Sequence, residues 1–248
     1  MAESNEIIYG RNAVAEAIKS GRPINKIIYS GELKGSLGKI AADAGRAHII
    51  MSKVSGNDMD TICGTENHQG VAAYISPVEY ATVDDILQKA EDLGEPPFII
   101  ILDELQDPHN LGAILRTCDA VGAHGVIIPK RRSVQLTGTV SKASAGAVEY
   151  VPVARVTNIS AAINELKDKG LWIYGTDMEG DSEFYNTDLK GPLALVIGSE
   201  GFGMSRLVKE QCDFLVSIPM AGKISSLNAS VAAGVVMYEI YRQRKAAK

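Results

Sequence analysis

The 248-residue sequence has few residues that form disulfides or bind metals. Its three cysteines, Cys63, Cys118 and Cys212, lie far apart and form no CxxC pair or other ligand spacing. We therefore expect them to be reduced packing residues. The four histidines also lack a metal-binding spacing such as HExxH, so no metal site is predicted.

Long apolar runs are also missing. No stretch approaches the roughly 20 apolar residues that a membrane-spanning helix needs. The start of the chain, MAESNEIIYG, lacks the basic residues and the apolar stretch of a signal peptide. These absences predict a cytoplasmic protein without a membrane partner.

The sequence has no excess of positive charge. Its net charge of −5 argues against non-specific coating of nucleic acid, which relies on many Lys and Arg contacts to phosphate. Local basic patches are compatible with this charge, and residues 129–133 and the C-terminal YRQRKAAK are candidates. Taken alone, each is more often solvated surface charge.

Apolar runs and helical patterns alternate from Phe98 onward. The runs FIIILD, GVIIP, YVPVAR, LWIYGTD, LALVIGSEG and FLVSIPM are continuous, which is typical of strands buried on both faces. They predict an α/β domain with a mostly parallel sheet and helices on both faces. The helices are expected at 111–121, 137–145, 159–169, 205–211 and 227–244.

A smaller α/β unit precedes this domain. GRNAVAEAIKSG has the pattern of an amphipathic helix, a second helix is expected near 39–44, and INKIIYS, AHIIMS and QGVAAYIS are typical of strands. A connecting segment with a helix at 83–93 ends in GEPP. We predict an N-terminal domain over 1–77, a linker over 78–97 and a second domain over 98–248.

Candidate site residues follow the strands, because parallel sheets bind ligands beyond the carboxyl ends of their strands. Asn110 follows the first strand and could serve as a helix N-cap. Arg116 lies in the apolar stretch LGAILRTCDAVG, where a guanidinium needs a partner wherever it is buried.

The loop after LALVI is rich in glycine. Gly198, Gly201 and Gly203 form G-x-x-G-x-G, the reverse of a dinucleotide fingerprint, and no GxxxxGK[ST] loop is present. The glycines permit close approach to a ligand, but a plain turn also explains them.

The last candidate is the stretch IPMAGKISSLNASVAAGVVM. Ser225 or Ser226 could cap the helix that follows, but one cap suffices, and Ser226 and Asn228 together exceed that need. The helix is small and apolar all round, so we expect it to be buried against the sheet and a second surface. That surface could belong to the same chain or to another subunit.

Three segments together resemble a known family. DELQDPHNLGAILRTCDAVGAHGVIIP, LALVIGSEGFGMS and FLVSIPMAGKISSLNASVAAGVVMYE are similar to the three ordered motifs of the SpoU/TrmH RNA ribose 2′-O-methyltransferases. IIYGRNAVAEAI and NHQGVAAYISP resemble the RNA-binding N-terminal domain of the subgroup that methylates a guanosine in bacterial 23S ribosomal RNA. The resemblance implies S-adenosylmethionine as cofactor, a homodimer and a C-terminal trefoil knot.

The resemblance also implies which residues form the site. Those matching the reaction centre are Asn110, Arg116, Glu200, Ser226 and Asn228. Those matching the cofactor pocket are Thr176, Gly198, Glu200, Gly201, Ile218, Met220 and Leu227. The family proposal makes the arginine a base. Because a guanidinium stays protonated in proteins, we instead expect Arg116 to bind a phosphate and polarise the hydroxyl.

Other functions are weighed against this one. The chain could instead methylate transfer RNA or another ribosomal nucleotide, as an antibiotic-resistance methyltransferase does. It could also be a non-catalytic RNA-binding module built on the same scaffold. The missing fingerprint disfavours a nucleotide-dependent oxidoreductase. Polarity and position suggest further RNA contacts by residues 10–12, 68–69 and 130–132.

Overall fold

The computed structural model of the chain describes residues 6–22, 24–47, 49–75, 79–130 and 132–246. The chain forms two compact units. The N-terminal unit comprises Met1–Glu79 and Leu136–Tyr150, and the C-terminal unit comprises Tyr80–Gln135 and Val151–Lys248. A short segment from the middle of the sequence therefore belongs to the N-terminal unit.

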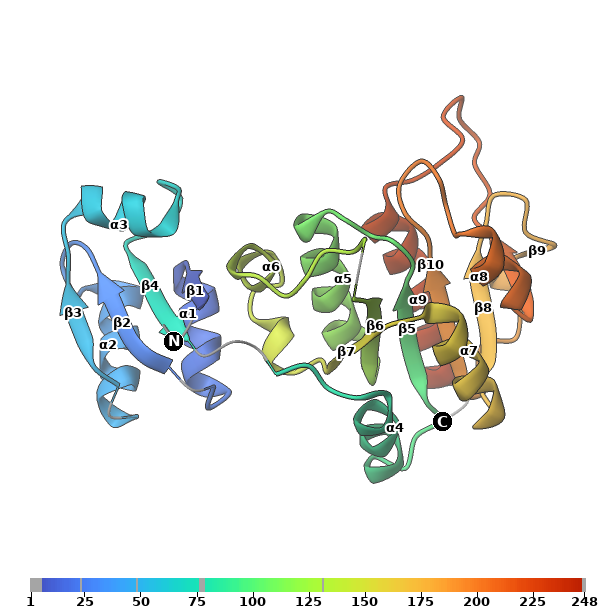
Figure 1. Cartoon of the computed structure of the whole chain (residues 1–248), viewed down its shortest axis with the longest axis horizontal. Coiled ribbons are helices and arrows are strands. Elements are labelled where there is room, and N and C mark those ends of the chain that lie inside the picture. The colour runs from blue at the N-terminus through green and yellow to red at the C-terminus, as the bar shows by residue number, and fades with distance from the viewer. Residues whose placement is uncertain (1–5, 23, 48, 76–78, 131, 247–248) are drawn as a thin grey trace. The chain divides into compact units, whose positions relative to one another are not determined.

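The N-terminal unit is built on a four-stranded sheet (Figure 1). Its strand order is β1 (Glu6–Tyr9), β4 (Val71–Ile75), β2 (Ile24–Tyr29) and β3 (Met51–Lys53). Helices α1 (Arg11–Lys19) and α2 (Gly35–Arg46) pack Val14 and Ile40 against one face. Met59 of α3 (Gly56–Cys63) packs with Ile28 and Ala72 in a separate core cluster. The sequence pattern predicted α1, α2 and three of the strands, whereas β1 and α3 were not predicted.

The segment Leu136–Tyr150 contains α6 (Gly138–Ala143) and the short 3₁₀ helix η1 (Ala147–Glu149). A Cβ at Gly138 would lie 2.1 Å from the carbonyl oxygen of Ile7, so only glycine allows this approach. Glu149 forms a 2.7 Å ion pair with Arg22, and both side chains are almost fully buried. Nothing in the periodicity of the predicted helix at 137–145 indicates that it packs in this unit.

The C-terminal unit contains a seven-stranded sheet, and all the strand pairs described in it are parallel. The strand order is β7 (Val153–Val156), β6 (Gly125–Pro129), β5 (Phe98–Leu102), β10 (Leu193–Ile197), β8 (Trp172–Thr176), β11 (Phe214–Ser217) and β9 (Ser182–Glu183). The predicted α/β class with a mostly parallel sheet is confirmed.

Helices cover both faces of this sheet (Figure 1). On one face, α4 (Val83–Asp92), α7 (Ile159–Asp168) and α8 (Arg206–Gln211) share a core with inward residues of the central strands, such as Ile99 and Ile101. On the other face, α5 (Pro108–Val121) packs against α9 (Ala229–Ala246), with Cys118 Sγ 3.9 Å from Met237 Sδ. No helix among the described residues is long and apolar enough to cross a bilayer.

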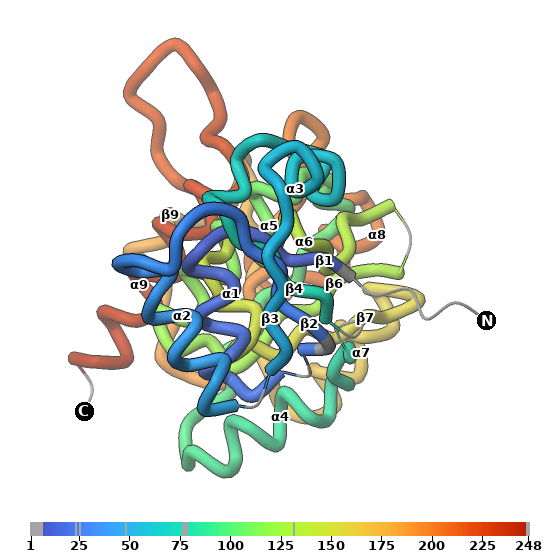
Figure 2. Tube along the Cα trace, turned by 90° about the vertical axis from the view of Figure 1, so that its left-hand side faces the viewer, coloured from blue at the N-terminus to red at the C-terminus, as the bar shows by residue number. Residues whose placement is uncertain are grey.

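The connection from β11 to α9 is a long exposed loop that reaches well away from the sheet (Figures 1 and 2). Within the described part of the chain, residues 218–227 make no backbone hydrogen bonds with other backbone groups. Because β5, β10 and β11 run parallel, the loops that follow them leave the same edge of the sheet. This edge is where the candidate site should form.

Candidate active site

The first loop at this edge leads from β5 into α5. Asp107 is the N-cap of α5: its Oδ1 accepts a 3.0 Å hydrogen bond from the backbone N–H of His109, and Pro108 follows as the first helical residue. The alternative that Asn110 caps this helix is therefore wrong. Because Asp107 provides the cap, the Asn110 side chain can hydrogen-bond elsewhere, although it is only 4% exposed.

The glycine loop after β10 is a tight turn. Ser199 and Gly203 exchange two backbone hydrogen bonds of 2.9 Å, and a Cβ at Gly198 would lie 2.2 Å from the carbonyl carbon of Gly203. Asp103, at the end of β5, accepts a 2.7 Å hydrogen bond from the N–H of Ser205 and so anchors the far end of the loop. The glycines thus build a compact turn that presents Glu200.

The third loop ends at the N-terminus of α9, where Asn228 is the cap. Its Oδ1 accepts hydrogen bonds from the N–H groups of Ser230 at 3.0 Å and Val231 at 3.3 Å. The expectation that Ser225 or Ser226 caps this helix is therefore wrong. Both serines are exposed, and their side chains make no hydrogen bond to any described residue.

The three loops meet in a cluster of one carboxylate and two amides, which we call the Asn-Glu-Asn cluster (Asn110, Glu200, Asn228). Asn110 Nδ2 donates to Glu200 Oε1 at 2.9 Å, and Asn228 Nδ2 donates to Asn110 Oδ1 at 3.0 Å. Asn228 Nδ2 also donates to Glu200 Oε1. These bonds fix the orientation of all three side chains, and a bound hydroxyl could be positioned against them.

Two predicted reaction-centre residues stay outside this network. Arg116 follows Asn110 by six residues on α5. Its side chain is exposed, so it does not need the partner that a buried guanidinium requires. No hydrogen bond or ion pair joins Arg116 to another residue in the described part of the chain. Ser226 likewise lies exposed in the loop before α9.

The predicted cofactor residues lie at the same edge of the sheet. Thr176 ends β8, and its Oγ1 donates to the carbonyl of Val196 on β10 at 3.2 Å. Gly198 and Gly201 belong to the tight turn, while Ile218, Met220 and Leu227 lie in the exposed loop after β11. Unpaired backbone groups and part-exposed apolar side chains in this loop are suited to holding a nucleoside.

One exposed aromatic residue was missed as a site candidate. Phe202 follows Glu200 by two residues in the tight turn, and its side chain is 95% exposed. A phenylalanine that avoids the core at the tip of a constrained turn is a signal that the sequence contains, since GSEGFGMS places it between two glycines. Only the structure shows that no described side chain covers it.

The buried Cys118 and the partly buried Cys212 do not provide a nucleophile. Burial raises the pKa of the Cys212 thiol to about 12 and raises the pKa of Cys118 still further, so both remain protonated at neutral pH. Within the described ranges, no three His, Cys, Asp or Glu side chains are gathered as a metal site would require.

Some suggested RNA contacts serve the fold instead. His68 is buried; its Nε2 lies 2.8 Å from Asp60 Oδ1, and its Nδ1 accepts from the N–H of Gly70 at 2.9 Å. Both ring nitrogens are therefore used inside the N-terminal unit. Lys130 and Arg132 are exposed, and Arg131 lies outside the described residues.

Comparison with known proteins identifies the family. The profile of the SpoU rRNA Methylase family matches residues 97–238, and a profile described as RNA 2′-O ribose methyltransferase substrate binding matches residues 7–81. A TrmH family tRNA/rRNA methyltransferase of Bacillus subtilis is 52% identical over 245 residues, covering 98% of both chains. The chain belongs to the SpoU rRNA methylase family.

Solved structures agree with this assignment. The SpoU methyltransferase AviRb from Streptomyces viridochromogenes, in complex with AdoMet, aligns with a TM-score of 0.82 at 26% identity, covering 97% of this chain and 90% of that chain. The TrmH/SpoU tRNA modifying enzyme of A. aeolicus aligns with a TM-score of 0.56 at 31% identity, covering 66% of this chain and 84% of that chain. The predicted enzyme class, an RNA methyltransferase, is confirmed.

Proposed function

We propose that this enzyme transfers a methyl group from S-adenosylmethionine to the ribose 2′-hydroxyl of a guanosine in 23S ribosomal RNA. The Asn-Glu-Asn cluster at the carboxyl edge of the sheet is the observation that carries the proposal, since it fixes polar side chains where parallel sheets bind their ligands. Because its proposed substrate is ribosomal RNA, the enzyme would act in the cytoplasm.

A ribosomal substrate is favoured over transfer RNA by the extent of the matches. The tRNA modifying enzyme covers only 66% of this chain, whereas a structure described as an rRNA methyltransferase from Sinorhizobium meliloti covers 97% of it. The additional coverage includes the N-terminal unit, which matches the substrate-binding profile over residues 7–81. A tRNA substrate remains the second candidate, because the curated Bacillus subtilis relative is named for both RNA types.

The residues present fit S-adenosylmethionine. Met220 and Leu227 expose apolar side chains on the loop after β11, and the backbone groups of Gly198, Ile218 and Leu227 would hold the adenosine. Thr176 and Gly201 would border the same pocket. When bound, this cofactor supplies an electrophilic methyl group on a sulfonium centre.

The protein must position and activate a weak nucleophile, the 2′-hydroxyl. The Asn-Glu-Asn cluster, with Ser226, would orient the hydroxyl oxygen through hydrogen bonds. Arg116 would bind the neighbouring phosphate and polarise the hydroxyl, because a guanidinium remains protonated and cannot act as a base at neutral pH. Its exposure, with no described partner, leaves its N–H donors available for that phosphate.

Phe202 would stack on a base of the RNA. Sequence-specific RNA recognition uses unstacked bases that pack on aromatic side chains. Phe202 is almost fully exposed and belongs to the turn that presents Glu200, so a base held there would lie beside the reaction centre.

The enzyme would act as a homodimer. The outer side of α9 carries Val231, Val235 and Tyr238 at helical spacing, and Val231 and Tyr238 are each about half exposed. A second copy would cover this apolar strip. The trefoil knot implied by the family resemblance also remains a prediction.

The decisive experiment is a methyl-transfer assay with radiolabelled S-adenosylmethionine and an unmodified 23S ribosomal RNA transcript. Primer extension at low dNTP concentration then maps the methylated nucleotide. We expect incorporation at one guanosine ribose and none in transfer RNA transcripts. Transfer to tRNA alone would overturn the substrate assignment, and absence of cofactor binding would overturn the proposed chemistry.

A further inference from the structure

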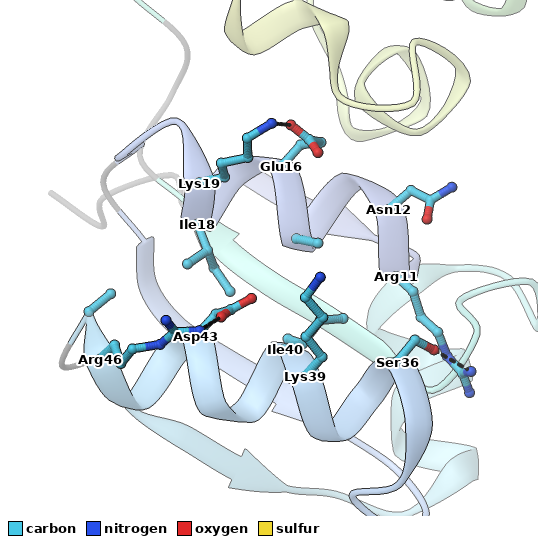
Figure 3. Close-up of a pocket in the computed structure, with 12 residues that line it drawn as sticks. Arg11, Asn12, Glu16, Ile18, Lys19, Ser36, Lys39, Ile40, Asp43 and Arg46 are labelled. Carbon is cyan, nitrogen blue, oxygen red and sulfur yellow. Dashed lines mark hydrogen bonds and ion pairs between the residues drawn. The ribbon is translucent and has the colours of Figure 1, made fainter.

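The N-terminal unit contains a groove between α1 and α2 (Figure 3). Its volume is about 620 Å³, and apolar side chains such as Ile18 and Ile40 form part of its lining. Charged side chains from both helices form the rest. All of the lining residues belong to the N-terminal unit: Arg11, Asn12, Ala15, Glu16, Ile18, Lys19, Ser36, Lys39, Ile40, Asp43, Arg46 and Ala47.

The groove concentrates positive charge, although the domain has no net positive charge. Residues 1–79 contain eight Lys and Arg against nine Asp and Glu, a net charge of −1. Four of those eight cations line the groove, but only two of the nine acids do. The two acids are matched within the groove, since Lys19 pairs with Glu16 and Arg46 pairs with Asp43.

Two cations therefore remain without an acidic partner in the groove, Arg11 and Lys39. Arg11 Nε donates to the carbonyl of Gln69 at 3.1 Å. Arg11 Nη1 donates to Ser36 Oγ at 2.9 Å, a bond that Figure 3 shows. These bonds hold the guanidinium in place and use two of its five N–H donors. Lys39 forms no hydrogen bond or ion pair with any residue that the structure describes, and its amine extends into the space between the helices (Figure 3).

We propose that this groove binds the phosphodiester backbone of the RNA substrate. Arg11, held by Gln69 and Ser36, and Lys39 would each contact a phosphate, while the partly buried Ala15 and Ile18 would pack against riboses. The inference rests on the proposed function, because it assigns a surface to the RNA on which that reaction occurs. Contacts of this kind position RNA without reading its sequence.

The test compares two doubly substituted full-length proteins. The groove variant is Arg11→Gln with Lys39→Gln. The matched control is Lys26→Gln with Lys53→Gln, which removes the same charge from the same domain at positions outside the groove. Thermal melting and S-adenosylmethionine binding are measured first, and we expect neither to change in either variant.

Binding of an unmodified 23S ribosomal RNA transcript is then measured by filter binding across a salt series. The groove variant should bind roughly 10-fold more weakly at low salt, and the slope of log Kd against log salt should fall by about 1.5, as expected for two lost phosphate contacts. The control should match wild type. Equal affinity and slope in the groove variant and control would overturn the proposal and leave the groove to a protein partner.

This experiment separates the two proposals. RNA binding that depends on the groove, together with a wild-type protein that transfers no methyl group to any RNA, would reject the proposed reaction and retain the binding surface. Normal methyl transfer with a groove variant that behaves as wild type would do the reverse.

Discussion

The Asn-Glu-Asn cluster and the α1/α2 groove differ in whether their polar side chains have partners. In the cluster, two amides and a carboxylate hydrogen-bond to one another, and Asn228 also caps α9. In the groove, Arg11 and Lys39 are left without acidic partners. The first arrangement favours one fixed geometry, and the second favours attraction of a charged polymer.

This difference predicts two kinds of mutational effect. Changes in the cluster should lower the rate of methyl transfer with little change in RNA affinity. Changes in the groove should lower RNA affinity and its salt dependence with little change in the rate at saturating RNA. Substitutions at four positions outside the groove sharpen the comparison, in decreasing order of expected effect.

Arg116→Ala should lower the single-turnover rate by about 10²–10³-fold, because a donor aimed at the reacting groups is lost. Arg116→Lys should be nearly as slow, since a lysine cannot replace the planar fork of N–H donors. The measurement is rapid-quench methyl transfer at saturating RNA over a range of pH. Near-normal turnover and an unchanged pH profile in Arg116→Lys would remove the special role of the guanidinium.

Glu200→Ala should slow methyl transfer by about 10²-fold, because both amide donors lose their shared acceptor. Glu200→Gln keeps an acceptor oxygen and should retain most of the activity. The two variants are compared by their kcat values with S-adenosylmethionine binding as the control. If Glu200→Gln were as slow as Glu200→Ala, the carboxylate would be a proton acceptor and not a positioning group.

Phe202→Ala should weaken productive RNA binding by roughly 10-fold, since stacking of a base on an aromatic ring contributes about 1–3 kcal/mol. Phe202→Trp should restore binding. In a Trp172→Phe background, where the single native tryptophan is absent, fluorescence of the introduced ring should be quenched by RNA. Full affinity in Phe202→Ala at an unchanged oligomeric state would show that no base stacks there.

The smallest effect concerns His124, which lies outside both regions. Its Nδ1 accepts the backbone N–H of Phe98 at 2.9 Å, and burial, followed by the charge of Arg244, lowers the pKa of its imidazole. Below the ordinary pKa of about 6.5, His124 binds a proton in the unfolded chain but not in the folded chain. The free energy of unfolding should therefore fall as pH decreases.

Urea unfolding between pH 7 and pH 5 measures this contribution. The wild-type unfolding free energy should fall more steeply than that of His124→Asn, with a difference of at most about 1.4 kcal/mol per pH unit. Asparagine can still accept the N–H of Phe98, so the comparison isolates the proton. Parallel slopes would show that His124 protonates equally in both states.

Six of the seven strands of the C-terminal sheet were predicted from continuous apolar runs, because central strands such as β5, β6 and β10 are buried on both faces. The edge strand β9 was missed, since its two residues, Ser182 and Glu183, form no apolar run. The helices of this unit were also found, with ends shifted by one to three residues, as for α5 at Pro108–Val121 against the predicted 111–121. In the N-terminal unit, β1 and α3 were missed, since EIIY is short and GNDMDTIC buries only Met59.

The caps show why the site could not be derived from sequence patterns alone. Asn110 and Asn228 are both residue types that cap helices, yet Asp107 caps α5 and Asn228 caps α9 while also joining the cluster. Which polar residue serves the helix and which serves the site depends on contacts between residues 118 positions apart. The family resemblance selected these residues, and the structure brings Asn110, Glu200 and Asn228 together.

We propose that the Asn-Glu-Asn cluster positions the reacting groups and that the α1/α2 groove binds RNA electrostatically. This distinction is tested most directly by measuring one pair of variants on one RNA. Glu200→Ala and the Arg11→Gln, Lys39→Gln variant are each assayed for Kd and single-turnover rate on the unmodified 23S ribosomal RNA transcript. We predict that the first loses rate at unchanged Kd and that the second loses affinity at an unchanged saturated rate. Equal losses of rate and affinity in both variants would contradict the account.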